Sequence, residues 1–228
     1  IDYSLKSFLF KNKYLLHLVS LFKLIPRRIY LEILSYPDTI INHDLRKGIP
    51  FESNSVDLIY LSHVLEHIPR DQSVAFIKEC KRILRPNGIL RIVIPNLHYQ
   101  IHEYLRTYQY VDSILDENDF SRFIDHEKSI ENIFDQFIVR VPRHYSSFFS
   151  LRGILQRIFM GSTARSGILH QWMYDKYTLE YIIRQAGFDR FIFNSFASSS
   201  RIDFNIADID AYGNERKPNS LYVDASND

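Results

Sequence analysis

Residues 48–69 read GIPFESNSVDLIYLSHVLEHIP, and residues 79–95 read ECKRILRPNGILRIVIP. The two stretches contain apolar runs at 56–61 and 89–94, which have the length and composition of strands in a sheet covered on both faces. Between these runs, residues 71–84 keep apolar side chains at helical spacing, and the RPNG sequence that follows stops the helix and turns the chain. Strand, helix and strand in this order predict a βαβ unit with parallel strands and a right-handed crossover.

The flanking sequence extends this unit into a larger sheet. Its predicted elements are strands at 39–42, 189–197 and 220–225 and a helix at 178–186 that ends before Gly187. Residues 97–169 do not continue the alternation, and we expect them to form a largely helical insertion that acts as a lid or substrate cap. The whole chain, residues 1–228, is therefore predicted to be a single α/β domain that carries this insertion.

The overall composition excludes several classes of protein. With 228 residues, of which 46% are hydrophobic and 24% charged, the chain suits one soluble globular core. The net charge is +1, so the composition gives no electrostatic case for binding nucleic acid. Cys80 is the only cysteine, which excludes an internal disulfide and a multi-cysteine zinc site and fits a reducing compartment.

The first part of the chain is basic. Apolar side chains recur at three- and four-residue spacing over residues 5–22, and no acidic residue lies between Tyr3 and Leu31. We therefore expect a basic amphipathic helix, which charged residues interrupt too often for it to span a membrane. Two interpretations stay open for residues 5–28: a helix packed on the domain with its lysines in water, or a helix in peripheral contact with a membrane surface.

An acidic stretch lies within the insertion. Residues 112–135 hold eight acidic and two basic side chains, which gives a net charge of minus six. Such a stretch is usually a solvated helical face. Because its charge equals that of the N-terminal helix and is opposite in sign, contact between the two segments is a second interpretation.

The two stretches quoted first carry a family resemblance. In order and spacing they resemble class I S-adenosylmethionine-dependent methyltransferases, and the similarity extends from Asn42 to Asn96, over His170 to Phe188 and over the strand at 220–225. The most similar members are small bacterial enzymes that often accompany polysaccharide synthesis. The resemblance implies a Rossmann-like, doubly wound, mostly parallel sheet with helices on both faces and an antiparallel last strand. It also implies S-adenosylmethionine as the cofactor, bound at the carboxyl ends of the strands.

The resemblance further implies which residues contact the cofactor. It places Asp44 opposite the adenine amino group, Leu45 against the adenine ring, and Ser62 and His63 beside the sulfonium. The family's Gly-rich loop is not found in the sequence, so the resemblance implies that this loop lies upstream and that the chain alone binds the cofactor weakly or not at all. Asp2 would then end the second strand of the sheet and bond the ribose hydroxyls. The alternatives are that Asp2 is a solvated terminal residue and that Asp44 caps a turn.

The sequence HVLEH after the strand expected at 56–61 admits two metal-binding interpretations. Its H-x-x-E-H pattern is that of the inverzincin proteases, which need a continuous helix that Pro69 makes too short here. The small-RNA terminal 2′-O-methyltransferases carry a similar acid-x-x-Glu-His with a further histidine, and these residues hold a divalent ion on the sugar hydroxyls. Glu66, His67 and His170 match that arrangement, whereas His63 departs from its first acid. Because of this departure we expect no metal and a metal-free histidine pair.

The combined prediction is methyl transfer from S-adenosylmethionine to a hydroxyl group of a sugar or glycan. Transfer at a sulfonium carbon needs alignment and, for an alcohol, a group that accepts a proton, which suits histidine. The catalytic candidates are His67, His63 and His170 in that order, with Glu66 as their companion.

The expected partner is a small-molecule or glycan acceptor and not a nucleic acid. The expected location is the cytoplasm, with peripheral contact to the inner membrane face through residues 5–28 as an option. The alternative functions are methylation of a lipid-like or quinone-precursor acceptor, and a catalytically silent binding module.

Overall fold

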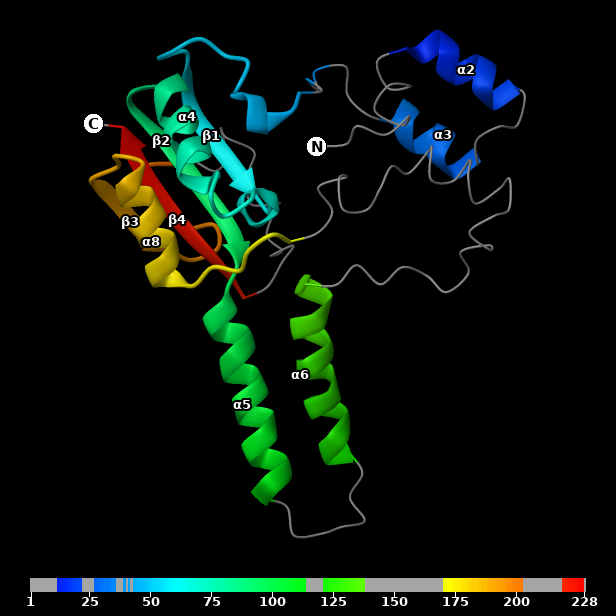
Figure 1. Cartoon of the computed structure of the whole chain (residues 1–228), viewed down its shortest axis with the longest axis vertical. Helices are drawn as coiled ribbons and strands as arrows, with labels where there is room; N and C mark the ends of the chain where they lie inside the picture. Colours follow the sequence, from blue (N-terminus) through cyan, green and yellow to red (C-terminus); the bar gives the residue numbers. More distant parts are fainter. Residues whose placement is uncertain are drawn as a thin grey trace. The chain divides into compact units, whose positions relative to one another are not determined.

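The computed structural model describes residues 12–21, 27–35, 39, 41, 43–113, 121–137, 170–202 and 219–227 (Figure 1). The chain divides into two compact units. Unit 1 comprises residues 1–45 and 139–169, and unit 2 comprises residues 46–138 and 170–228. All four described strands belong to unit 2. That the whole chain forms one domain with an insertion stays a prediction.

A four-stranded sheet forms the centre of unit 2 (Figure 1). Its strands are β1 (Val56–Ser62), β2 (Leu84–Pro95), β3 (Arg190–Asn194) and β4 (Ser220–Asn227), in the order β1-β2-β4-β3. β1 and β2 are parallel, and β4 is antiparallel to both of its neighbours. The predicted mixed α/β, Rossmann-like class is therefore confirmed, together with the parallel βαβ unit and the antiparallel last strand.

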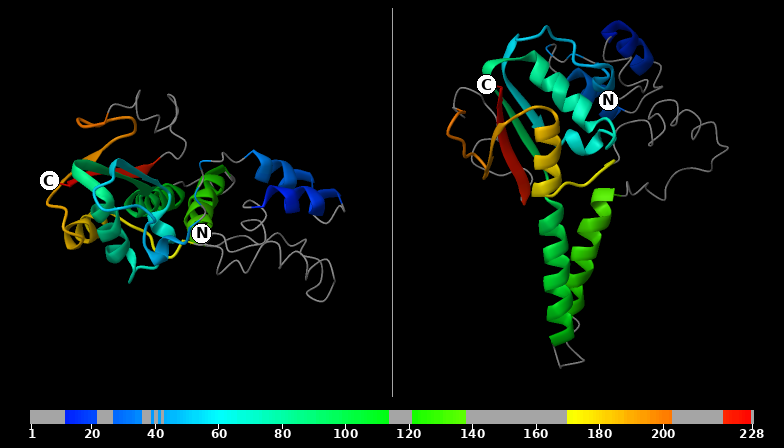
Figure 2. Two further views of the ribbon diagram at one scale, coloured as in Figure 1. Left: turned by 90° about the horizontal axis from the view of Figure 1, so that it is seen from above. Right: turned by 60° about the vertical axis from the view of Figure 1, so that its left-hand side comes forward.

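Two helices of unit 2, α4 (Ser73–Ile83) and α8 (Lys176–Gln185), pack against each other on one face of the sheet (Figure 2). In α4 the helical spacing places the apolar residues on the buried side, and these are Phe76, Ile77, Cys80 and Ile83. Complete burial of one such side chain stabilises the fold by about 1.5–3 kcal/mol. Helices on the second face, which the resemblance also implies, are not among the described elements of unit 2.

The ends of α8 follow from its sequence. Asp175 accepts a hydrogen bond from the backbone N–H of Thr178 at 2.8 Å, and the Thr178 hydroxyl oxygen accepts one from the backbone N–H of Asp175 at 3.0 Å. This capping box satisfies two backbone donors at the start of the helix. At the other end, Gly187 has a φ of +91°, a conformation that favours glycine, and it closes the helix as predicted.

The RPNG sequence makes the turn predicted between α4 and the main part of β2. β1 pairs with β2 on both sides of residues 85–88, which bulge out of that ladder. Asn87 is exposed and has a φ of +64°, which asparagine tolerates better than most residues. A side chain at Gly88 would approach the backbone oxygen of Arg85 to 2.8 Å, so this position accepts only glycine.

A buried ion pair joins β2 and β4. Arg91 and Asp224 are register partners in the two strands, and Nη1 of Arg91 lies 2.8 Å from Oδ1 of Asp224. Asp224 also accepts a hydrogen bond of 2.7 Å from the amide of Asn194 in β3. The three polar groups therefore link the last three strands of the sheet.

The described part of the insertion is a pair of helices, as predicted. α5 (Leu97–Ser113) and α6 (Ser121–Phe137) lie side by side in both figures (Figure 1, Figure 2). The Thr107 hydroxyl of α5 lies 3.1 Å from Nδ1 of His126 and 3.0 Å from the Ser129 hydroxyl of α6, so polar contacts fix the register of the pair. The rest of the insertion lies outside the described residues, and its lid function stays a prediction.

Unit 1 contains two short helices, α2 (Lys13–Leu21) and α3 (Arg27–Leu34), in the region where the sequence predicts one basic helix. Residues 1–11 and 22–26 lie outside the described part of the chain. None of the described helices is both long and apolar enough to cross a membrane. Contact of this region with the acidic stretch of α5 and α6 stays untested, because those helices belong to unit 2.

The strand expected at 39–42 and the predicted end of β3 differ from the structure. The strand expected at 39–42 is not formed at Thr39 or Ile41, which lie in a turn and in irregular backbone, and its other two residues are outside the described chain. No described strand pairs with these positions, and a strand needs a partner for its backbone hydrogen bonds. β3 ends at Asn194, three residues earlier than predicted, because the chain turns there and Ala197 takes a φ of +46°.

Candidate active site

The residues singled out in the sequence meet at one edge of the sheet in unit 2. His63 follows β1 directly, and Glu66 and His67 lie in a one-turn 3-10 helix, η2 (Leu65–His67). The carboxyl ends of parallel strands share one edge, and antiparallel β4 begins at that edge with Ser220, the register partner of Pro95. The name histidine cluster is used below for His63, Glu66, His67 and His170.

Backbone hydrogen bonds bring His170 to η2. The carbonyl oxygen of Glu66 accepts hydrogen bonds from the N–H groups of Gln171 at 2.6 Å and Trp172 at 3.3 Å. A little further along, the carbonyl oxygen of Tyr174 accepts one from the N–H of Leu97 at 2.9 Å. Two segments about a hundred residues apart in the sequence are therefore held in register, and the His67 and His170 side chains meet from these two segments.

Glu66 is the centre of the cluster. Its Oε1 lies 3.0 Å from Nδ1 of His63 and 4.0 Å from Nε2 of His170. The rings of His67 and His170 meet edge to face, with centroids 4.7 Å apart and an interplanar angle of 77°. The Glu66 side chain is only 1% exposed, whereas those of His63 and His170 are 21% and 16% exposed, so the imidazoles separate the carboxylate from solvent.

The Glu66 carboxylate lacks aligned hydrogen bonds. Its contact with His63 is short enough for one, but neither oxygen has a hydrogen-bond partner of acceptable geometry within the part of the chain that the structure describes. A buried carboxylate costs several kcal/mol unless a positive charge or hydrogen-bond donors compensate it. The contact of Glu66 with His63 is therefore a close approach without an aligned hydrogen bond.

His63 is also held from its other side. Its backbone N–H donates to the Val93 carbonyl oxygen at 2.8 Å, and its Nε2 lies 3.4 Å from the Ser220 hydroxyl oxygen. His63 and Asn219 have φ values of +53° and +65°, which cost non-glycine residues of order 1–3 kcal/mol each. The sequence analysis missed Ser220. The signal that could have found it is its place as the first residue of an antiparallel strand, at the edge where the parallel strands end.

The residues predicted to contact the cofactor are distributed over both units. Ser62 is exposed at the end of β1, one residue before His63. Asp44 is buried, and it belongs with Leu45 to unit 1, whereas the cluster belongs to unit 2. Asp2 lies outside the described residues. The cofactor roles of these residues stay predictions.

The protease interpretation of HVLEH is excluded by the local fold. η2 contains only three residues, and Ile68 after it is extended, with ψ of 131°. The H-x-x-E-H pattern needs both histidines on one continuous helix to reach one metal ion. The expectation that Pro69 leaves too little helix is therefore confirmed.

A different set of three residues could hold a metal ion. Glu66, His67 and His170 each offer one ligand atom, and these atoms lie within 4.8 Å of one another. Two imidazoles and a carboxylate suit a divalent transition metal such as zinc or manganese better than magnesium, which prefers oxygen ligands. The ligand atoms would have to approach to roughly 3.3 Å to share an ion with bonds of about 2 Å. The expectation of a metal-free cluster stays untested.

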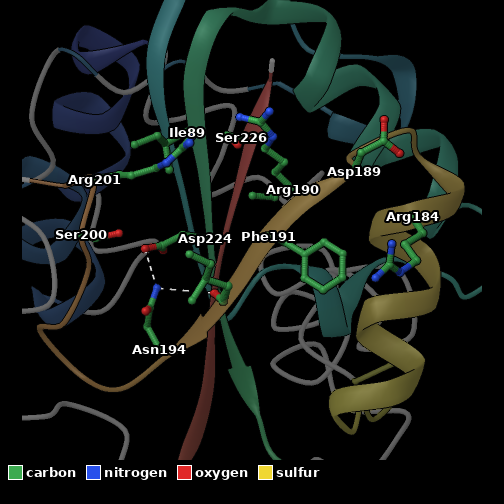
Figure 3. Close-up of a pocket in the computed structure, with 12 residues that line it drawn as sticks. Ile89, Arg184, Asp189, Arg190, Phe191, Asn194, Ser200, Arg201, Asp224 and Ser226 are labelled. Carbon is green, nitrogen blue, oxygen red and sulfur yellow. Dashed lines mark hydrogen bonds between the residues drawn. The ribbon is translucent and has the colours of Figure 1, made fainter.

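A cavity of about 360 Å³ lies beside β3 and β4 (Figure 3). Its lining includes Ile89, Ala225 and Ser226, which lie near the amino end of β2 and therefore at the opposite end of the sheet from His63. Figure 3 shows Asn194 bound to Asp224 in its wall. Because the chemically active side chains gather at the other edge, we assign the candidate active site to the histidine cluster.

Comparison with known proteins gives a family match for part of the chain. Residues 30–92 match the family described as "Methyltransferase domain". A relative named "Probable S-adenosylmethionine-dependent methyltransferase" from Mycolicibacterium smegmatis is 38% identical over 61 residues, which are 27% of this chain and 23% of that protein. The chain thus matches about a quarter of that relative's length.

Two solved structures show a partial overlap with the chain. A SAM-dependent methyltransferase from Archaeoglobus fulgidus has a TM-score of 0.40 and 11% identity, over 89% of this chain and 73% of that one. A SAM-dependent methyltransferase from Thermotoga maritima has a TM-score of 0.38 and 13% identity, over 88% of this chain and 68% of that one. The fold assignment rests on the strand order and direction in unit 2 and not on these scores.

The strand order and direction in unit 2 define a Rossmann-like domain. The family match covers the HVLEH sequence, β1 and β2 as far as Ile92, and it confirms the resemblance to class I S-adenosylmethionine-dependent methyltransferases. S-adenosylmethionine is accordingly the cofactor of this class.

Proposed function

We propose that the protein transfers a methyl group from S-adenosylmethionine to a hydroxyl group, and that the acceptor is a sugar or glycan. The observation that carries this proposal is the histidine cluster at the carboxyl edge of β1 and β2, where the class binds its cofactor. A cluster of three imidazoles around one buried carboxylate suits proton removal from an alcohol, which methylation of a weakly acidic oxygen requires.

In this mechanism the protein mainly aligns the acceptor oxygen with the methyl group and the sulfur. S-adenosylmethionine, when bound, supplies a methyl group on a positively charged sulfur. The exposed end of β1 at Ser62 and His63 would border the sulfonium, and Asp44, Leu45 and Asp2 would hold the adenosine part. An imidazole of the cluster accepts the acceptor's hydroxyl proton, and the Glu66 carboxylate stabilises the imidazolium that forms.

One surface aromatic residue next to the cluster, Trp172, supports a carbohydrate acceptor. Trp172 lies two residues after His170 and is 42% exposed. The Arg70 guanidinium is 5.7 Å from the centroid of the Trp172 ring and holds it from one side. A partly exposed, fixed indole offers an apolar face to the C–H side of a sugar ring, while the nearby imidazoles meet its hydroxyl groups.

The test is methyl transfer from labelled S-adenosylmethionine to a panel of sugars and bacterial glycans, analysed by mass spectrometry. We expect product with an O-methyl group, and loss of 10²–10⁴-fold in kcat when both His67→Ala and His170→Ala are present. The exposed His102→Ala on α5 is the matched control. Full activity of the double variant would leave alignment alone to carry the reaction.

The metal question is decided in the same assay. If Glu66, His67 and His170 hold a divalent ion, it would polarise the acceptor oxygen, and removal with EDTA should abolish transfer until zinc or manganese is added back. Activity that survives EDTA agrees with the metal-free cluster expected from the sequence.

A lipid-like acceptor is the second candidate, and one observation favours it. Tyr14, Leu18 and Leu21 lie at spacings of four and three on α2 and are all exposed, in a region rich in lysine. Peripheral contact with the inner face of a membrane would present such an acceptor. Co-sedimentation with anionic vesicles, with transfer only to vesicle-borne acceptors, would favour this candidate over the glycan.

A further inference from the structure

The cavity beside β3 and β4 lies outside the candidate active site, and its lining is rich in hydrogen-bond donors (Figure 3). The lining includes three arginines, which are Arg184, Arg190 and Arg201, and the hydroxyl group of Ser226. We propose that this cavity is a second ligand site, which binds a small organic molecule through its phosphate group. The inference goes beyond the proposed function, because it involves neither the cofactor nor the methyl acceptor.

The cavity and the histidine cluster lie at opposite ends of β4. Ser220 begins this strand beside His63, whereas Ser226 lines the cavity and is only 5% exposed. Six residues of extended strand separate the two serines, which corresponds to about 20 Å. A small ligand in the cavity therefore does not reach the histidine cluster.

The strand register places Arg190 next to Ser226. The two residues are partners in the antiparallel pair of β3 and β4, so their side chains lie on the same face of the sheet about 5 Å apart at Cβ. Ile89 in β2 is the partner of Ser226 on the other side and shares that face. One patch of the sheet thus combines a guanidinium, a hydroxyl group and an apolar side chain.

The loop that carries Arg201 is anchored to the sheet. Nη1 of the buried Arg91 donates to the Ser198 carbonyl oxygen at 3.3 Å, and Nη2 of the same residue donates to that of Ser195 at 3.4 Å. The Ser199 hydroxyl oxygen accepts a hydrogen bond of 3.1 Å from the backbone N–H of Arg201. The backbone at Arg201 is therefore in place before a ligand arrives, which lowers the entropic cost of binding.

The acidic residues of the lining do not cancel the positive charge. The Asp224 carboxylate lies 2.8 Å from Nη1 of Arg91 and accepts a hydrogen bond of 2.7 Å from Asn194, so its charge is compensated within the sheet. Asp189 is well apart from Arg201 in Figure 3. With Asp224 compensated, the lining has three arginines and one aspartate, and it favours an anion.

Arg184 has a different role from the other two arginines. Its Nε donates to Glu180 at 2.9 Å, and its guanidinium carbon is 4.6 Å from the centroid of the Phe191 ring. Glu180 therefore compensates the charge of Arg184. The phosphate group of the ligand is accordingly held by Arg190 and Arg201.

The lining fits a phosphate group on an organic molecule better than a lone ion. A guanidinium presents a planar fork of N–H donors to two phosphate oxygens, and two guanidiniums compensate a phosphate dianion. The cavity volume of about 360 Å³ is at the small end of the range of roughly 300–1,000 Å³ that is usual for small-molecule sites. Ile192 is 54% exposed in this lining and offers an apolar surface to the organic part of the ligand.

The first experiment is isothermal titration calorimetry of the whole protein with glucose 1-phosphate, at constant ionic strength and without cofactor. We expect one site with a Kd of about 1 mM or below. Glucose should not bind, and inorganic phosphate should bind more weakly than the sugar phosphate. Equal binding of inorganic phosphate would reduce the site to one for a lone ion, and binding to phosphatidylglycerol vesicles alone would place the phosphate on a lipid, so either result would overturn the inference.

The second experiment tests the two arginines. The double variant Arg190→Gln with Arg201→Gln should raise the Kd of glucose 1-phosphate at least tenfold, because it loses two charge-assisted contacts. Lysine at both positions keeps the charge but not the planar fork, and it should recover only part of this loss. Arg106→Gln on α5 replaces another exposed arginine, which is paired with Glu103, and it is the matched control with an unchanged Kd. Thermal unfolding without ligand verifies that each variant is folded.

Two further outcomes would contradict the inference. One is that the unsubstituted protein does not bind glucose 1-phosphate at millimolar concentration, and the other is that the folded double variant binds it as tightly as the Arg106→Gln control. Failure of the proposed function is a separate result, because it appears as a lack of methyl transfer to hydroxyl acceptors, which neither binding experiment measures.

Discussion

Within the histidine cluster, Glu66 is the residue that brings the free-energy cost of a buried charge. Its carboxylate is buried among imidazoles, and the carbonyl oxygen of the same residue fastens the His170 segment by two backbone hydrogen bonds. The proposed function therefore depends on the side chain of Glu66, whereas the local fold depends on its main chain. Because the carboxylate and the backbone carbonyl are separate groups, a substitution of the side chain can remove the carboxylate and leave the two backbone hydrogen bonds in place.

This separation predicts that Glu66→Gln loses activity without losing stability. The amide is nearly isosteric and neutral, so it avoids burying a charge, and we expect the free energy of unfolding to stay equal or to rise by about 1–3 kcal/mol. Methyl transfer should fall at the same time. Calorimetric unfolding beside a transfer assay tests this prediction, and a drop in stability of more than 1 kcal/mol would show that the carboxylate is fully compensated in the native state.

The position of the histidine cluster at the sheet edge could be predicted from the sequence, but the contacts that its side chains make could not. HVLEH directly follows an apolar strand, and edge placement of its residues follows from the parallel sheet alone. The contact of Ser220 with His63 joins residues 157 positions apart. It depends on the register of β4 against β2, which no local pattern in the sequence specifies.

At the level of elements, α8 is the helix whose start is defined best. The hydrogen bonds from Thr178, first the backbone N–H and then the side chain, lower the pKa of Asp175 below its ordinary value of 3.8. Because the folded pKa is the lower one, the ionised cap stabilises the fold above the unfolded pKa. That stabilisation is lost as the pH falls through the lowered folded value.

Asp175→Ala should therefore destabilise unit 2 by about 0.5–2 kcal/mol at neutral pH. The difference from the unsubstituted protein should shrink as the pH falls below about 4. Denaturant unfolding at a series of pH values measures it. Asp175→Asn keeps a capping oxygen at every pH and is the control, and a difference from Asp175→Ala that persists unchanged at pH 2 would contradict the argument.

The elements differ in how far the sequence determines them. α4 and α8 are nearly where their apolar spacing and end signals place them, since those signals are local. The strand expected at 39–42 fails because an apolar, β-branched run becomes a strand only beside another strand, and none is described there. In the basic region, α2 lies within the helix expected from the apolar spacing at 5–22, whereas α3 lies beyond that spacing.

On the scale of the molecule, the chain divides into two compact units. Leu16 is buried in unit 1, and the core of unit 2 includes Cys80, the only cysteine of the sequence. Burial raises the pKa of the Cys80 thiol to about 12, so the thiolate form that reacts with thiol reagents is suppressed in the folded state.

Labelling of Cys80 should therefore report the unfolding of unit 2 alone. At pH 8 we expect a thiol reagent to react at the rate of unfolding and to accelerate sharply at the denaturant midpoint of the sheet. Mass spectrometry of quenched samples follows the reaction. Fast labelling without denaturant would show that α4 opens on its own while the sheet stays folded.

The buried pair of Arg91 and Asp224 has a consequence for the fidelity of folding. A slip of β4 by one residue would turn each of its side chains to the opposite face, leave the guanidinium without its carboxylate in a dry interior, and carry Ser220 away from His63. A sheet with β4 in the wrong register is thus destabilised by an uncompensated buried charge. The ion pair therefore favours the native register of β4 against β2. The same register sets the contact of Ser220 with His63 at the edge of the sheet.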